Sequence, residues 1–113
     1  MKKTYLTETT ILSVFDYKNN EKKLLGKMIS GIVIKDDINR FSSGQRVITS
    51  TIETQEQYEY TTKSGNCYVT DDEPGNFEIS FVEFVVMRHK LCSPEKIVEM
   101  RQALKLADDR IMH

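Results

Sequence analysis

Only one stretch of this sequence carries the pattern of a helix, and it lies near the C-terminal end of the 113 residues. Ser93 is a favourable N-cap, Pro94 suits the first helical position, and Glu95 places a carboxylate at the positive end of the helix dipole. The apolar residues that follow recur every three or four positions, at Ile97, Met100, Leu104, Ala107 and Ile111. We therefore predict one C-terminal helix over 94–111, packed on a sheet through this apolar stripe.

Residues 4–90 are dominated by β-branched and aromatic residues separated by turn formers, which predicts about six strands. We expect these strands over 4–17, 24–34, 46–54, 58–62, 67–70 and 77–87, and an exposed loop over 16–23. Gly26 or Gly31 is expected to mark a bulge or a close approach of another backbone. Residues 82–87 are apolar on both faces apart from Glu83, as in a strand that enters the centre of a sheet or contains a bulge.

The order of these elements leaves no room for helices between strands. The sheet is therefore expected to be antiparallel and meander-like, in a single α+β domain over residues 1–113. The pattern leaves open whether the sheet closes into a barrel.

Charge is distributed unevenly along the chain, although its formal net value is only −1. Residues 51–83 carry eight acids and Lys63 as their only base, whereas bases exceed acids on both sides of this segment. A nucleic-acid binder normally shows a basic excess, so this class is not expected. The basic N-terminus lacks the apolar run of a signal peptide, and no stretch approaches the ~20 apolar residues of a membrane span. We expect a cytoplasmic protein without a membrane segment.

Residue types that commonly carry catalysis are few and poorly placed. His89 lies between two cations, which oppose its protonation, and His113 is the last residue. Cys67 and Cys92 are expected to be partly buried apolar side chains, although Cys92 is close enough to His89 to form a thiol–imidazole pair. Glu83 is expected to form an ion pair at the core edge; the alternative is a buried carboxyl with a raised pKa. No motif for a metal or a phosphate-containing cofactor is present, so no enzyme, metal site or cofactor is predicted.

Two stretches of the sequence resemble a loose group of small bacterial proteins. Residues 40–52 contain the pattern Phe-x-x-Gly-x-x-hydrophobic-x-Thr-Ser, beginning at Phe41, and residues 62–68 contain Thr-x-Ser-Gly-x-x-Tyr, beginning at Thr62. The group includes immunity proteins that neutralise toxins delivered between competing bacteria, and the resemblance implies such an accessory role. The shared positions are strand and turn formers, so no functional residue is carried over from it.

These observations favour a non-enzymatic module that binds a protein, such as an immunity protein or antitoxin covering the basic surface of a nuclease toxin. Six acids are expected to contact the partner, with two tyrosines as aromatic anchors: Glu53, Glu56, Glu59, Asp71, Asp72, Glu73, Tyr58 and Tyr60. Alternatively, the acids are only a solvated face. A second hypothesis is a homodimeric regulatory or phage-derived accessory protein that pairs edge to edge through Tyr58, Tyr60 and Tyr68. A third is a ligand or hydrolytic site around Glu83 and His89.

Overall fold

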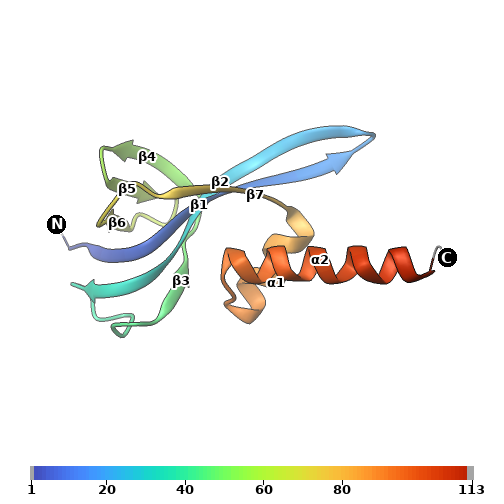
Figure 1. Cartoon of the computed structure of the whole chain (residues 1–113). Helices are drawn as coiled ribbons and strands as arrows, with labels where there is room; N and C mark the ends of the chain where they lie inside the picture. Colours follow the sequence, from blue (N-terminus) through green and yellow to red (C-terminus); the bar gives the residue numbers. More distant parts are fainter. Residues whose placement is uncertain (1, 112–113) are drawn as a thin grey trace.

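Two long strands, β1 (Thr4–Lys18) and β2 (Glu21–Asp36), form the hairpin on which the rest of the molecule is built (Figure 1). The computed structural model describes the backbone of residues 2–111 and the side chains of residues 2–106. The hairpin turns at Asn19 and Asn20, whose φ angles are 54° and 64°. Asparagine tolerates this left-handed conformation, and such a two-residue turn matches the twist of the strands it joins. The loop predicted over 16–23 is therefore wrong, because both strands continue to the turn.

The remaining strands extend this hairpin into a seven-stranded sheet. β3 (Arg46–Ile48) pairs with β2, while β4 (Ile52–Glu56), β5 (Glu59–Thr62) and β6 (Cys67–Thr70) form an antiparallel meander that returns to β1. β7 (Gly75–Ser80) also pairs with β1, and both β6 and β7 run parallel to it. The predicted α+β fold is confirmed, and the sheet, predicted to be antiparallel, is mostly so. The pairing with β1 departs from a simple meander, and the sheet curls without closing into a barrel.

The strand predicted over 46–54 is two strands, because the chain turns a corner at residues 49–51. The Thr49 N–H donates to the Ile29 carbonyl (3.0 Å), and the Thr49 hydroxyl accepts from the Ile29 N–H (3.0 Å). Two residues later, the Thr51 carbonyl accepts from the Lys63 N–H (2.7 Å) beyond the end of β5. The chain thus crosses from one edge of the sheet to the other. This crossing curls strands β3, β2, β1, β6, β5 and β4 into an open half-barrel.

A bulge in β1 places its apolar residues on opposite faces of the sheet. Glu8 has a φ of 50°, and three steps along β1 from Thr7 to Thr10 match only two steps along β2. Because side chains alternate between faces, the extra residue moves Leu12 to the face opposite Leu6. The first core, inside the half-barrel, comprises Leu6, Ile29, Val33, Val47, Tyr60 and Tyr68. The second core, beneath the helices, comprises Leu12, Val14, Ile79, Phe84, Met87 and Ile97.

Residues 82–87, predicted as a strand, belong to a second helix, α1 (Phe81–Lys90). The Ser80 hydroxyl accepts from the Glu83 N–H (3.1 Å), and the Glu83 carboxylate accepts from the Ser80 N–H (2.9 Å). This reciprocal pair is a capping box, which satisfies two donors at the helix start. The box and the burial of Phe84 and Met87 outweigh the strand preference of the neighbouring valines. The prediction of one helix, with the sheet reaching residue 90, is therefore wrong.

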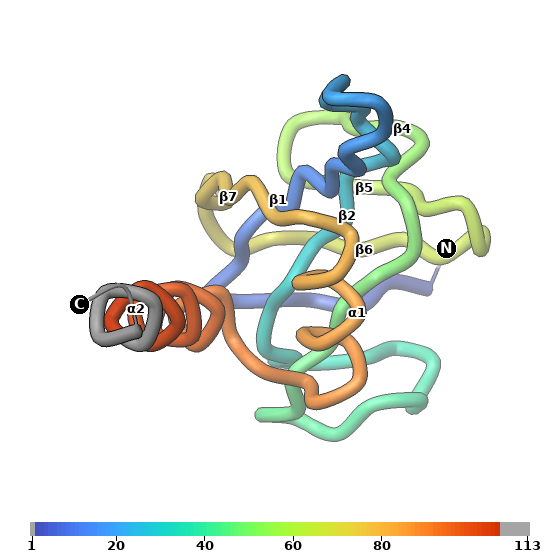
Figure 2. Tube along the Cα trace, turned by 90° about the vertical axis from the view of Figure 1, so that its right-hand side faces the viewer, coloured from blue at the N-terminus to red at the C-terminus, as the bar shows by residue number. Residues whose placement is uncertain are grey.

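Helix α2 (Pro94–Ile111) begins where the sequence predicts, with the Ser93 hydroxyl accepting a backbone N–H at 3.3 Å. Among its described side chains, those of the first turns pack against the second core, because Ile97 is buried and Met100 half-buried whereas Leu104 is 65% exposed. The side chains of the remaining two stripe residues, Ala107 and Ile111, lie outside the described ones. Figure 2 shows α2 nearly end-on beside the sheet. The hairpin and α2 extend in the same direction and give the molecule its 57 Å length.

A buried carboxylate holds the loop between β2 and β3. The two oxygens of Asp36 accept four hydrogen bonds, from the Thr4 hydroxyl (2.8 Å) and from the N–H groups of Ile38 (3.2 Å), Arg40 (2.7 Å) and Phe41 (3.0 Å). Burial raises the pKa of Asp36, but these hydrogen bonds outweigh it and hold the pKa below its ordinary value. The charged form of Asp36 is therefore part of the folded structure.

Candidate functional site

A groove of about 510 Å³ opens at the mouth of the half-barrel, on the face of the sheet opposite the helices. Its floor includes Ile11 of β1 and Gly26 of β2. Gln55 of β4, Tyr58 of the β4–β5 turn and Glu73 of the β6–β7 loop also line it. Three segments that are distant in sequence thus meet around one concave surface.

Gly26 allows β4 to start close to β2. A Cβ atom at Gly26 would lie only 3.0 Å from the Thr51 Cγ2 atom, so a side chain there would push the start of β4 away. The hairpin register also shifts beside this glycine, because Val14 pairs with Gly26 but Phe15 pairs with Leu24. The predicted bulge or close approach is therefore confirmed at Gly26. From this contact β4 leads away from β2, which opens the groove (Figure 1).

Of the three tyrosines predicted to contact a partner, only Tyr58 is exposed. Tyr58 is 48% exposed in the β4–β5 turn, whereas Tyr60 (1%) and Tyr68 (4%) lie in the first core. Burial raises the pKa of Tyr60, and the nearby carboxylate of Glu73 raises it further. Tyr60 therefore supports the groove from beneath. If two copies paired edge to edge, Tyr58 would be the one exposed ring of the three that were expected to form the contact.

Glu73 lines the groove, and four more of the six predicted acids lie on the two segments that contribute to its lining. All five are exposed. Among the described side chains, no Lys, Arg or His nitrogen lies within 4.0 Å of their carboxylates. Two of them lie on β4 and three in the β6–β7 loop: Glu53, Glu56, Asp71, Asp72 and Glu73. The two segments are adjacent, since the Thr70 N–H donates to the Tyr58 carbonyl at 2.9 Å. We refer to these five residues as the acidic rim.

The sixth acid, Glu59, is engaged within the fold. Its carboxylate lies 3.1 Å from Lys3 Nζ and accepts a hydrogen bond from the Cys67 thiol at 3.1 Å. The thiol and then the lysine lower the pKa of Glu59. Burial and the adjacent carboxylate raise the pKa of Cys67 to about 11, so this thiol stays protonated. Cys67 is the buried side chain that the sequence predicts, and Glu59 has a structural contact.

The other residues considered for chemistry lie on the helical side of the molecule. Arg101 Nη2 donates to the Glu83 carboxylate at 2.7 Å, which confirms the predicted ion pair, although Glu83 caps a helix and does not lie on a strand. Arg101, followed by the cap hydrogen bonds, lowers the pKa of Glu83 despite its partial burial. His89 is exposed in the last turn of α1, while Cys92 is half-buried against the second core. The remaining histidine, His113, lies outside the described residues.

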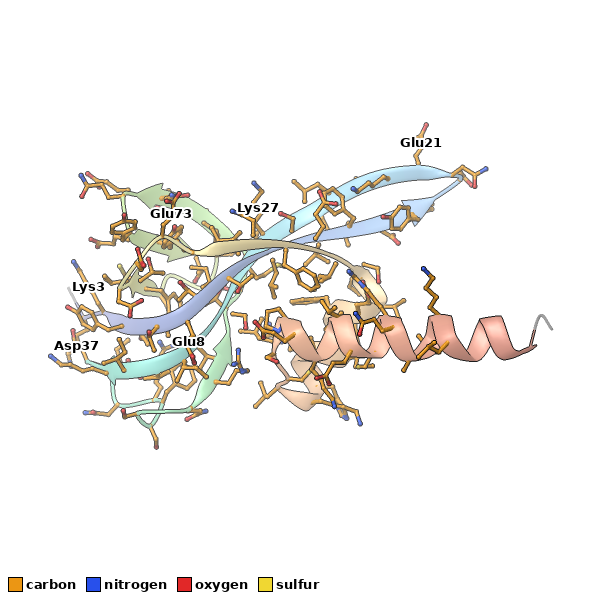
Figure 3. The ribbon with its side chains drawn as sticks, in the orientation of Figure 1. Lys3, Glu8, Glu21, Lys27, Asp37 and Glu73 are labelled. Atoms are coloured by element: carbon orange, nitrogen blue, oxygen red, sulfur yellow. The ribbon has the colours of Figure 1, made fainter. Side chains whose placement is uncertain are left out.

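Several polar residues of the groove were not predicted from the sequence. Lys27 of β2 and Asn76 of β7 line it together with Gln55 and Gln57. Figure 3 shows Lys27 and Glu73 on the same side of the molecule. Only the pairing of distant strands brings Lys27 and Asn76 to the groove, so no local sequence pattern could identify them.

Comparison of the chain with family models, curated proteins and solved structures finds no match. Within the described residues, no helix is long and apolar enough to span a membrane. No three His, Cys, Asp or Glu side chains are grouped as metal ligands in that same part of the chain. The groove and its acidic rim are therefore the features on which a functional assignment rests.

Proposed function

We propose that this chain is a non-enzymatic protein-binding module, specifically a bacterial immunity protein or antitoxin that covers the basic active-site surface of a toxin. The acidic rim is the observation that supports this proposal most directly. Clustered exposed carboxylates without cationic partners are complementary to a basic surface. A toxin that cleaves nucleic acid carries such a surface, because it must bind phosphates.

Tyr58 is the proposed anchor of the interface. Its ring is 48% exposed beside the groove, and an aromatic side chain near the centre of an interface commonly contributes a large part of the binding energy. The carboxylates around it raise the association rate and select a basic partner, while the groove accepts a side chain that projects from the toxin. Anchor and charges thus have separate roles.

The neighbouring gene provides the first test. A gene for a secreted toxin directly beside the gene for this chain would support the proposal. The purified toxin domain encoded by that gene is then the binding probe. Replacing Asp71, Asp72 and Glu73 together by Asn, Asn and Gln should slow association by roughly tenfold or more at low salt and reduce the salt dependence. Glu21→Gln is the matched control, because this acid lies at the far tip of the hairpin (Figure 3).

These measurements distinguish a wrong interface from a wrong function. Unchanged association of the triple variant removes the β6–β7 loop from the interface. If the wild-type chain neither binds the toxin domain nor restores growth of cells that produce it, the proposed function is wrong.

A second candidate function is a homodimeric regulatory or phage-derived accessory protein. The observation that favours it is the outward face of α1, where Phe81, Val82 and Val85 are 47%, 72% and 48% exposed. Sedimentation equilibrium of the wild type and of Val82→Lys tests it. A stable dimer that the lysine disrupts favours this function, and a monomer at all concentrations excludes it.

A further inference from the structure

The free edges of the sheet differ in how they are protected from pairing with another chain. On β7, the Glu78 carbonyl accepts a hydrogen bond from Arg101 Nη2 of α2 (3.0 Å). The part of β2 that pairs only with β1 carries Lys22, Lys23 and Lys27. A covering helix and edge lysines are both devices that prevent a strand from pairing with other chains.

Strand β4 has neither device among the described residues. It pairs only with β5, and residues 53–57 are all exposed. The groove lies alongside it, since Ile52, Gln55 and Gln57 all line that space. In an antiparallel pair, alternate N–H and C=O groups of an edge strand point away from its neighbour. β4 therefore presents backbone donors and acceptors beside an open groove.

The charges on β4 disfavour pairing with a second copy of itself. Glu53 is the extra residue of a bulge, because Ile52 pairs with Thr62 but Thr54 already pairs with Thr61, and Glu56 ends the strand. Two β4 strands related by two-fold symmetry would bring these acids close to the acids of the other copy, and like charges across a strand pair are destabilising. A segment with basic side chains meets no such repulsion.

We propose that β4 accepts an extended segment of the partner as an additional strand, in which basic side chains alternate with apolar ones. This inference rests on the proposed function and specifies how the partner is recognised. The alternation follows from the register: Gln55 pairs with the buried Tyr60 and lines the groove, whereas Glu56 pairs with Glu59 on the other face. Successive side chains of an added strand face the groove and the carboxylates in turn.

A synthetic peptide of about ten residues that alternates lysine and valine, with blocked ends, tests this inference on the full chain. Its binding should shift the amide resonances of β4 in NMR spectra and slow hydrogen exchange at the outward-pointing amides. Two further peptides carry N-methyl groups at every second residue, in opposite phases. The one whose methyl groups face β4 should bind at least roughly tenfold more weakly than the other, because its backbone donors are blocked. Equal affinities of the two, or resonance shifts confined to other strands, overturn the inference.

Charge variants provide the matched controls. A peptide with glutamate in place of lysine should not bind, and Glu53→Gln combined with Glu56→Gln should weaken binding of the lysine peptide, whereas Glu21→Gln should not. Wild-type affinity in the double variant contradicts recognition by the β4 carboxylates. If sedimentation shows that the protein self-associates and that the lysine peptide abolishes this self-association, β4 pairs with a second copy of the chain and the inference is overturned.

Failure of this inference is distinguishable from failure of the proposed function. Phase-dependent peptide binding without toxin capture retains the strand-addition site and removes the immunity role. Toxin capture that leaves the β4 amides unprotected retains the immunity role and removes strand addition.

Discussion

Replacing the buried Asp36 by asparagine should destabilise the protein by about 3 kcal/mol at neutral pH. The substitution keeps the shape of the side chain but turns one carboxylate oxygen into an NH₂ group. With the amide oxygen at the Oδ1 position, the N–H groups of Arg40 and Phe41, which now lie 2.7 and 3.0 Å from Oδ2, would face another donor. Each buried donor left without an acceptor costs about 1–3 kcal/mol, and removal of a desolvated charge offsets part of this loss.

Urea titration and thermal melting followed by circular dichroism measure the change. At roughly 4 °C per kcal/mol for a chain of this size, the melting temperature should fall by about 12 °C. Asp71→Asn is the control, because it removes an exposed carboxylate, and it should change stability by less than about 0.5 kcal/mol. An Asp36→Asn protein as stable as the wild type would refute the assignment of these hydrogen bonds.

The difference in stability between the wild type and Asp36→Asn should depend on pH, in a direction set by the pKa of this carboxylate. The pKa of Asp36 in the folded protein is lower than its ordinary value of 3.8, so the unfolded chain binds a proton first as the pH falls. Stabilisation by the charged form is thus complete well above pH 3.8 and is lost as the pH falls through the folded-state pKa. The gap between wild type and Asp36→Asn should therefore narrow in acid, and a gap that stays constant there contradicts the mechanism.

Three further predictions concern the helices and the thiols. Arg101→Met removes the ion pair to Glu83 and the contact with the Glu78 carbonyl, so in urea titrations it should lower the free energy of unfolding by about 1–2 kcal/mol. Lys96→Met breaks an exposed ion pair and should lower it by less than about 0.5 kcal/mol, and equal losses would contradict the role of Arg101. Ser80→Ala removes the cap of α1 and should cost about 1 kcal/mol, which Ser80→Asp should largely restore in the same titration. Iodoacetamide at mildly alkaline pH should modify the half-buried Cys92 before the buried Cys67, and peptide mass spectrometry that finds the reverse order would contradict the high pKa of Cys67.

Elements decided by one or two residues could be predicted from the sequence. Pro94 after a serine cap located α2, because few other arrangements suit that pair. The Ser-x-x-Glu signature at residues 80–83 is equally local, but the run of valines behind it favoured a strand. Burial of Phe84 and Met87 decided the competition in favour of the helix, and that burial depends on tertiary contacts which no local pattern contains.

The candidate site was predictable in its charge and less so in its geometry. The acidic composition of residues 51–83 identified the rim, since exposed carboxylates need no particular neighbour. The alternation of Tyr58 and Tyr60 indicated two equivalent rings, but Tyr58 lies in a turn, so the strand period does not apply to it. Lys27 reaches the groove only through the curl of the sheet at Gly26. Features that depend on pairing between distant segments, such as the bulge at Glu8, have no local signal.

The position of β1 determines when the molecule can fold during synthesis. It is made before the other six strands of the sheet, yet Thr4 pairs with Tyr68 and Phe15 pairs with Ser80. One side of β1 therefore stays open until β6 and β7 have been made, because the first core includes Tyr68 and the second core includes Ile79. Contacts of such long range in sequence slow folding. The sheet around β1 can therefore be completed only after β6 and β7 have been made, and not when the N-terminal half of these residues emerges.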